Sequence, residues 1–166
     1  MKTKGKGFSL LEVIIAIFII TIGIAGILNL MSFSISSVAV SKSQIIAGTL
    51  AQEGLEVVRA IRDNNWLQDI LWYTGLDNCS TGCRVQYNNL GILPLAGNPF
   101  LKINANGFYQ YDDSGSDTIF PRKITIICIG ASCDSANEIR VISEVSWNER
   151  GRSFSVPAEV RLYNWK

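Results

Sequence analysis

The sequence predicts an α+β protein in which one long N-terminal helix packs, over its second half, on a small antiparallel β-sheet head. Two patterns carry this prediction. No charged residue occurs between Glu12 and Lys42, and apolar residues then recur at helical spacing as far as Ile61. In residues 139–162, apolar and polar residues alternate one by one, as they do in strands with one buried face.

Residues 8–41 form an apolar segment that is predicted to span a membrane. The segment is longer than the ~20 apolar residues that cross the hydrocarbon core. Lys2, Lys4 and Lys6 precede it, and basic residues beside a spanning helix favour the cytoplasmic side. We therefore expect a single helix in the cytoplasmic membrane, with residues 1–7 inside the cell and the C-terminus outside.

Residues 42–66 are predicted to continue the helix as an amphipathic segment. The sequence Asp63-Asn64-Asn65 is expected to end it, because short polar side chains compete with the helix for backbone hydrogen bonds. The apolar residues at helical spacing are Ile46, Leu50, Val57, Val58 and Ile61, and the charged residues between them are Glu53, Glu56, Arg59 and Arg62.

Residues 67–166 are predicted to form a head of strands and loops. Two alternating segments, 139–147 and 154–162, flank the turn sequence NERGR, which indicates an antiparallel hairpin. Two further segments, 107–111 and 118–129, flank the turn sequence DDSGSD. One face of this sheet is expected to pack on the amphipathic part of the helix, because that face would otherwise be exposed to water.

The composition argues against several classes of function. The chain has 166 residues and no histidine, which removes the commonest general base and the commonest metal ligand. Removing the three lysines of residues 1–7 leaves 12 basic and 14 acidic residues, a net charge of −2, which gives no electrostatic case for binding nucleic acid. The sequence has no G-x-S-x-G, no P-loop and no paired metal motif. We therefore predict a protein that is not an enzyme and has no cofactor and no metal.

The segment Gly7-Phe8-Ser9-Leu10-Leu11-Glu12 combines four features. A short basic leader precedes it, glycine is followed by phenylalanine, a glutamate lies four residues beyond Phe8, and an uninterrupted apolar helix follows. This combination resembles the cleavage and methylation signal of type IV prepilins and the related pseudopilins. The resemblance covers roughly residues 1–60. The helix-then-sheet layout beyond them is similar to a pilin head, but no motif there is diagnostic.

The resemblance implies how these residues are used. A prepilin peptidase would cut between Gly7 and Phe8, remove residues 1–7 as a leader, and methylate the new amine of Phe8. The helix of residues 8–41 would first lie in membrane lipid. An inner-membrane assembly platform would then join it to other pilin subunits. Glu12 would pair with the Phe8 amine of a neighbouring subunit and so fix the axial register. The resulting helical filament would be an extracellular pilus or a periplasmic pseudopilus.

One departure from the family pattern bears on the kind of subunit. Many major pilins have a proline partway along this helix, whereas the first proline here is Pro94 and Asn29 stands near the expected place. Gly23 and Gly26 are either helix-packing contacts or a softer segment of the helix. The missing proline and the small head favour a minor pilin over the main structural subunit.

Two simpler interpretations of the N-terminal segment are alternatives. A secretory signal peptide, with Ser37-Val38-Ala39 as its cleavage site, would have a hydrophobic region of only about 7–15 residues. A plain membrane anchor explains neither Gly7-Phe8 nor the carboxylate of Glu12, unless that side chain merely reaches the membrane surface.

Four cysteines, Cys79, Cys83, Cys128 and Cys133, are expected to form two disulfides, as exported chains commonly do. The local pairs Cys79–Cys83 and Cys128–Cys133 are favoured, but the sequence does not decide among the three connectivities. Zinc binding is the alternative that the Cys-x3-Cys and Cys-x4-Cys spacings leave open.

Three further groups of residues have both a structural and a functional interpretation. The acidic residues around Gly115 form a solvated turn or a calcium loop, although they do not fit the D-x-[DN]-x-[DN]-G pattern. The tryptophans fill the core or form a binding platform, and two arginines at the hairpin tip form an exposed turn or a DNA contact. We favour the structural interpretation for each group. The acidic residues are Asp112, Asp113 and Asp117; the tryptophans are Trp66, Trp72, Trp147 and Trp165; the arginines are Arg150 and Arg152.

The predicted function is that of a structural filament subunit. The alternatives are a type II secretion pseudopilin, a DNA-binding pilin of a competence system, and a membrane-anchored hydrolase. Filaments outside the cell would argue against the pseudopilin. Salt-dependent DNA binding by the head would support the DNA-binding pilin, and an activity screen of residues 42–166 would test the hydrolase.

Overall fold

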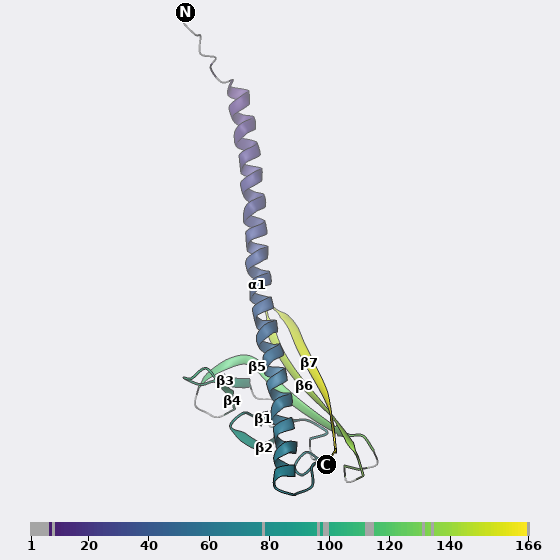
Figure 1. Ribbon diagram of the computed structural model, residues 1–166. Helices are drawn as coiled ribbons and strands as arrows, with labels where there is room; N and C mark the ends of the chain where they lie inside the picture. The colour runs from purple at the N-terminus through teal and green to yellow at the C-terminus, as the bar shows by residue number, and fades with distance from the viewer. Residues whose placement is uncertain are drawn as a thin grey trace, which may run out of the picture. The chain divides into compact units, whose positions relative to one another are not determined.

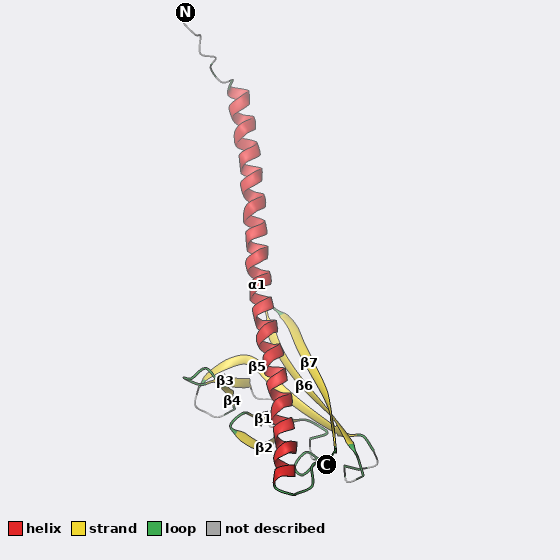
Figure 2. Cartoon of the chain, viewed as in Figure 1, coloured by secondary structure: helices red, strands yellow, loops and turns green. Residues whose placement is uncertain are grey.

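The computed structural model describes Gly7 and residues 9–77, 79–95, 97, 100–111, 115–130, 132–133 and 135–165. The chain divides into two compact units, Met1–Lys42 and Ser43–Lys166. In the described part of the chain, one helix is followed by seven strands (Figures 1 and 2). They are α1 (Leu10–Leu67), β1 (Cys83–Gln86), β2 (Asn89–Pro94), β3 (Phe100–Ile103), β4 (Tyr109–Gln110), β5 (Ser116–Cys128), β6 (Glu138–Glu149) and β7 (Arg152–Tyr163).

The first unit contains the N-terminal part of α1. None of its described side chains is buried, and large apolar side chains from Leu10 to Val38 are exposed all round the helix. Such a surface is stable only in lipid or against other apolar helices. Among the described residues, α1 is the one helix that is long and apolar enough to cross a membrane, judged by length and composition.

In the second unit, the remaining turns of α1 are amphipathic and lie across the sheet (Figure 2). The buried residues are spaced one helical turn apart, as the packing of one helix face requires. They meet the inward-facing residues of the strands in two core clusters, one around Val58 and Ile124 and the other around Ala51 and Trp147. The predicted α+β class is confirmed. The buried helix residues are Ala47, Leu50, Ala51, Gly54, Leu55, Val57, Val58, Ile61, Arg62, Asn65 and Trp66.

β5 is the central strand of the antiparallel sheet. Its second half, residues 122–128, pairs with residues 139–145 of β6, and β6 pairs with β7. Its first half pairs with β3, which also pairs with β4. β1 joins β5 at Ile124 and pairs on its other side with β2. The sheet therefore divides at Arg122, where the partner of β5 changes from β3 to β6 (Figure 1).

β6 and β7 form the predicted hairpin. They pair in register along their whole length, up to Glu149 opposite Arg152. Arg150 and Gly151 between them have φ angles of 53° and 75°, as a two-residue turn with positive φ at both positions requires. Among the described strands β7 pairs with β6 alone, and an edge strand of this kind tolerates Pro157, which has no backbone N–H.

The two strand segments that flank residues 112–117 are found as β4 and β5, and both pair with β3. The end of the helix differs from the sequence prediction. The helix continues to Leu67, beyond Asn65. The Asn65 side chain is buried, and its Nδ2 donates to the carbonyl oxygens of Trp72 (3.1 Å) and Thr74 (2.9 Å). It therefore holds the loop that follows the helix instead of competing for the helix backbone.

Gly54 lies where α1 contacts β5 and β6. A Cβ at this position would lie 2.7 Å from Ser143 Oγ and 2.8 Å from Ile124 Cδ1, which is closer than such atoms approach. We expect Gly54→Ala to lower the free energy of unfolding by about 1 kcal/mol, because overpacking costs about 1–3 kcal/mol and the better helix propensity of alanine offsets only about 1 kcal/mol. Chemical unfolding of the full chain in detergent measures this difference.

Gly48→Ala is the matched control for this substitution. Gly48 lies in the same helix, and nothing lies within 4 Å of the position that its Cβ would take. Alanine there should raise the free energy of unfolding by up to about 1 kcal/mol. Equal effects of the two substitutions would contradict the close packing at Gly54.

Candidate functional site

The predicted cleavage site lies directly before α1. Gly7 is exposed, and nothing lies within 4 Å of the position that a Cβ would take. Phe8 and residues 1–6 lie outside the described residues. The carbonyl oxygen of Ser9 accepts the first hydrogen bond of the helix, from the N–H of Val13 at 3.2 Å, and serine is a favoured residue at this capping position. Gly7 is thus accessible to another protein and lies just outside the helix.

Glu12 lies in the first turn of α1 and is exposed. The partial positive charge at a helix N-terminus favours a carboxylate at this place. Among the described residues, none forms a hydrogen bond or an ion pair with Glu12. The surrounding helix surface is apolar and exposed.

Two other polar side chains of the apolar segment are satisfied within the helix. Thr21 Oγ1 donates to the carbonyl oxygen of Phe18 at 2.8 Å, and Asn29 Nδ2 donates to that of Ala25 at 3.0 Å. α1 continues without a break through Asn29, near the place where many major pilins have a proline. Glu12 differs from both residues, because its carboxylate can only accept hydrogen bonds and no hydrogen bond to it is found among the described residues.

The structure joins the cysteines as two local disulfides, Cys79–Cys83 and Cys128–Cys133, which is the pairing that the sequence favours. The first is buried in the core and ties the loop after α1 to β1. The second closes the loop between β5 and β6. Zinc is bound by thiolates, which a disulfide does not offer. Within the described residues, no group of three or more His, Cys, Asp and Glu side chains is placed to hold a metal ion.

The tryptophans belong mainly to the core of the second unit. Trp66, Trp72 and Trp147 are buried, whereas Trp165 is exposed. Trp165 packs edge-on against Trp66 with ring centroids 4.3 Å apart. Three of the four residues are therefore inaccessible to a ligand, which favours the structural interpretation over a binding platform.

Asp117 lies at the start of β5, and the two arginines lie at the tip of the β6–β7 hairpin. Asp117 is exposed and its carboxylate lies 3.9 Å from Lys102 Nζ. Asp112 and Asp113 lie outside the described residues. Arg150 is the first residue of the two-residue hairpin turn, and Arg152 begins β7. Both arginines are exposed at the hairpin tip, which agrees with their interpretation as part of an exposed turn.

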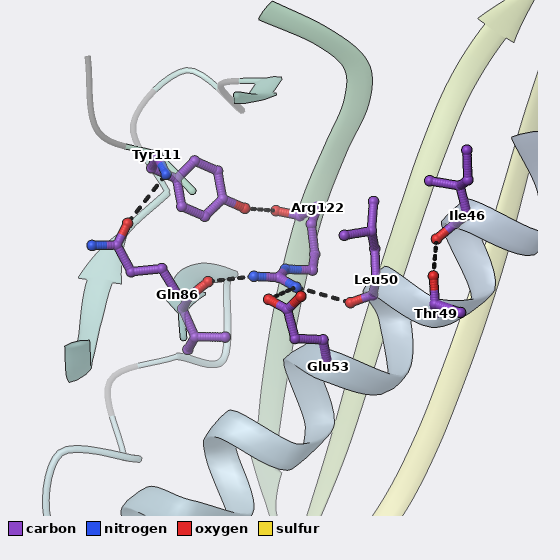
Figure 3. A network of polar contacts seen from close by, with 8 residues as sticks. Ile46, Thr49, Leu50, Glu53, Gln86, Tyr111 and Arg122 are labelled. Carbon is purple, nitrogen blue, oxygen red and sulfur yellow. Dashed lines mark hydrogen bonds and ion pairs between the residues drawn. The ribbon is translucent and has the colours of Figure 1, made fainter. Parts of the chain in front are cut away.

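The structure contains a buried polar network around Arg122 that the sequence does not predict (Figure 3). The guanidinium of Arg122 donates to the carbonyl oxygens of Leu50 and Val85 and pairs with Glu53. Tyr111 donates its hydroxyl to the carbonyl oxygen of Arg122 at 3.0 Å, and burial raises the pKa of Tyr111. The sequence contains one signal of this network: Arg122 occupies a position that alternates as the inward-facing residues of β5 do.

Comparison with known proteins bears on the N-terminal segment. Residues 2–28 match the family model described as the prokaryotic N-terminal methylation motif. No curated protein and no solved structure matches the chain. The matched residues include the accessible Gly7, the exposed Glu12 and much of the apolar helix surface, so the match and the geometry concern the same segment. The chain therefore carries the N-terminal cleavage and methylation signal of type IV prepilins.

Proposed function

We propose that the chain is a minor pilin, a structural subunit of a type IV pilus-like filament that assembles through its N-terminal helix. The methylation motif supports a pilin-like or pseudopilin-type subunit rather than an enzyme. The observation that carries the proposal is that one segment combines an accessible Gly7, an exposed Glu12 and a helix that is apolar all round. Such a helix needs lipid or other helices around it, and a filament core supplies the helices.

Processing comes before assembly. A prepilin peptidase cuts between Gly7 and Phe8 and methylates the amine of Phe8, which leaves residues 8–166 as the mature chain. Until assembly, the helix of residues 8–41 holds the chain in the lipid of the cytoplasmic membrane, with the head outside. An assembly platform in the inner membrane then adds the subunit to the filament. The lysines of the leader support this orientation, because basic residues favour the cytoplasmic side.

In the filament, Glu12 pairs with the methylated Phe8 amine of a neighbouring subunit. Each of these charges is costly in an apolar bundle when it stands alone, and pairing removes much of that cost. Only one axial stagger of two helices brings the two groups together, so the pair selects the register while the apolar side chains supply the adhesion. The lack of a partner for Glu12 among the described residues supports this role.

Two features favour a minor pilin over a major one. The helix has no proline near Asn29 and continues there without a break. The head beyond the helix is small, with about 100 residues. The same motif also fits a second candidate, a pseudopilin of type II secretion, whose filament would stay in the periplasm. The place where the mature chain accumulates distinguishes the two.

The intact mass of the chain, recovered from filaments sheared off cells, tests the proposed function. We expect the mass of residues 8–166 with two disulfides and one additional methyl group. The membrane fraction of the same cells is the control, since it contains the subunits that have not been assembled. A trimmed and methylated chain that occurs only in the membrane fraction would favour the pseudopilin. A chain that begins at Met1, or after Ala39, would contradict both candidates.

A further inference from the structure

Arg122 is a fully buried cation at the contact between α1 and the sheet. Its side chain is 0% exposed, and it lies on the inward face of β5 in step with Phe120 and Ile124. Burying a charged group costs several kcal/mol unless well-placed partners compensate for it. The partners of Arg122 therefore indicate which arrangement of the helix and the sheet the charge stabilises.

The guanidinium of Arg122 joins three elements (Figure 3). Nη1 donates to the carbonyl oxygen of Leu50 in α1 at 2.9 Å and to Glu53 Oε1 at 3.0 Å. Nη2 donates to the carbonyl oxygen of Val85 in β1 at 2.6 Å. The Glu53 side chain is 32% exposed, so a buried cation is neutralised by a carboxylate at the edge of the core. Two of the three acceptors lie within one turn of α1, which ties the guanidinium to that turn.

Gly54 leaves the carbonyl group of Leu50 open to Arg122. In a helix, a side chain covers the turn that precedes it, and position 54 has no side chain. A Cβ there would lie 3.3 Å from Arg122 Cδ, and closer still to Ser143 and Ile124. The buried residues one turn away on this face all carry a Cβ; they are Leu50, Ala51, Val57 and Val58. The contact with Arg122 therefore fits one position along the helix.

The apolar contacts of α1 distinguish its axial positions less sharply. Small and aliphatic residues recur on the buried face in every turn, so a shift by one turn, about 5.4 Å, again places apolar residues on the sheet. The charge of Arg122 tolerates such a shift less well, because it has to meet one carboxylate and one carbonyl group of α1. A shifted helix would leave this charge buried and unpaired. The recurring residues are Ala47, Leu50, Ala51, Leu55, Val58 and Ile61.

We propose that Arg122 acts as a register latch: together with Glu53 and Gly54, it selects one axial position of α1 on the sheet. The pair need not add to the free energy of unfolding, since apolar residues in place of a buried ion pair are often equally stable. Its effect is on which packed arrangement forms. The latch lies wholly within residues 43–166 and does not depend on assembly into filaments.

A distance measurement between two spin labels tests the latch. Labels on cysteines introduced at the exposed positions Gln52 in α1 and Ser155 in β7 report the axial position of the helix by double electron–electron resonance. The full chain is used in detergent, with its two disulfides intact. In the double variant Arg122→Met, Glu53→Met, we expect thermal unfolding close to that of the parent, but a second distance population or a clearly broader distribution.

The double variant Arg140→Met, Glu159→Met is the matched control. Arg140 donates two hydrogen bonds, of 2.8 and 2.7 Å, to the Glu159 carboxylate and thereby lowers the pKa of that group. Both residues lie on the exposed face of the β6–β7 hairpin, at positions that alternate with the buried ones. The control makes the same chemical change on the same sheet, and its distance distribution should stay as narrow as that of the parent.

Two results would overturn the latch: a distribution of parental width in the Arg122, Glu53 variant, or an equal broadening in the control. If the double variant does not fold, the single variant Arg122→Lys tests the latch instead. A lysine keeps the charge but lacks the planar fork that reaches Leu50, Glu53 and Val85 together. We expect a distribution of intermediate width for this variant, and one of parental width would equally overturn the latch.

Discussion

Glu12→Val should lower the amount of this chain in sheared filaments about tenfold or more, while the chain is still cut after Gly7. Removing the carboxylate leaves the Phe8 amine of the neighbouring subunit buried without a partner, which costs about 2–5 kcal/mol, and each 1.4 kcal/mol corresponds to a factor of ten. Cleavage should be unaffected, because Glu12 lies inside the helix and beyond the bond that is cut. The ratio of the chain in the filament and membrane fractions, with the N-terminal mass of each, measures both effects.

Thr21→Val is the control for this substitution. It also replaces a polar side chain of the apolar segment by valine, but the Thr21 hydroxyl is already bonded to the carbonyl oxygen of Phe18 in its own helix. The variant should therefore enter filaments in the parental amount. Parental amounts of Glu12→Val in the filaments would show that the ion pair does not set the register, whatever the state of the N-terminus.

The parts of the fold that follow from a local pattern could be predicted from the sequence. Alternation over residues 139–147 and 154–162, with Arg150-Gly151 in the turn, specifies the β6–β7 hairpin because each signal lies within about ten residues of the next. The helix is predicted for the same reason. Its apolar segment is uniform, and its amphipathic segment repeats once per turn.

The remaining features depend on contacts between distant residues. No local pattern indicates that the pairing partner of β5 changes from β3 to β6 at Arg122, because the sequence alternates in a way that suits a strand in both halves of β5. Asn65 resembles a helix-ending residue until its amide reaches Trp72 and Thr74. The role of Arg122 likewise becomes evident only when the Leu50 carbonyl group, 72 residues away, is known to lie beside it.

The roles of Gly7 and Glu12 stay predictions, and the sequence suggests them for a physical reason. Both residues lie in the segment that matches the methylation motif. In the proposed processing this segment is recognised as a linear signal, so the order of residues is itself the recognised feature. The partner of Glu12 belongs to another molecule in the proposed filament. The sequence of one chain therefore indicates that a partner is required without showing where it lies.

Gly7→Val should leave the chain at the mass of residues 1–166 and lower the rate of cleavage about 100-fold, the effect expected when a scissile bond is displaced by about 1 Å. In the chain itself, a side chain at position 7 meets nothing within 4 Å, so valine there should not disturb the fold. Any loss of cleavage therefore arises in the peptidase, where glycine allows the closest approach of the backbone. Mass spectrometry of membrane fractions measures the ratio of uncut to cut chain.

Gly5→Val is the control for this substitution, because it places the same side chain in the same leader but away from the bond that is cut. It should be processed at nearly the parental rate, and a full block in both variants would contradict a specific requirement at Gly7. The two major predictions also separate processing from assembly. Gly7→Val should be uncut and absent from filaments, since no Phe8 amine is released to pair with Glu12. Glu12→Val should be cut and methylated and still be depleted from filaments, because only the partner of the amine is missing.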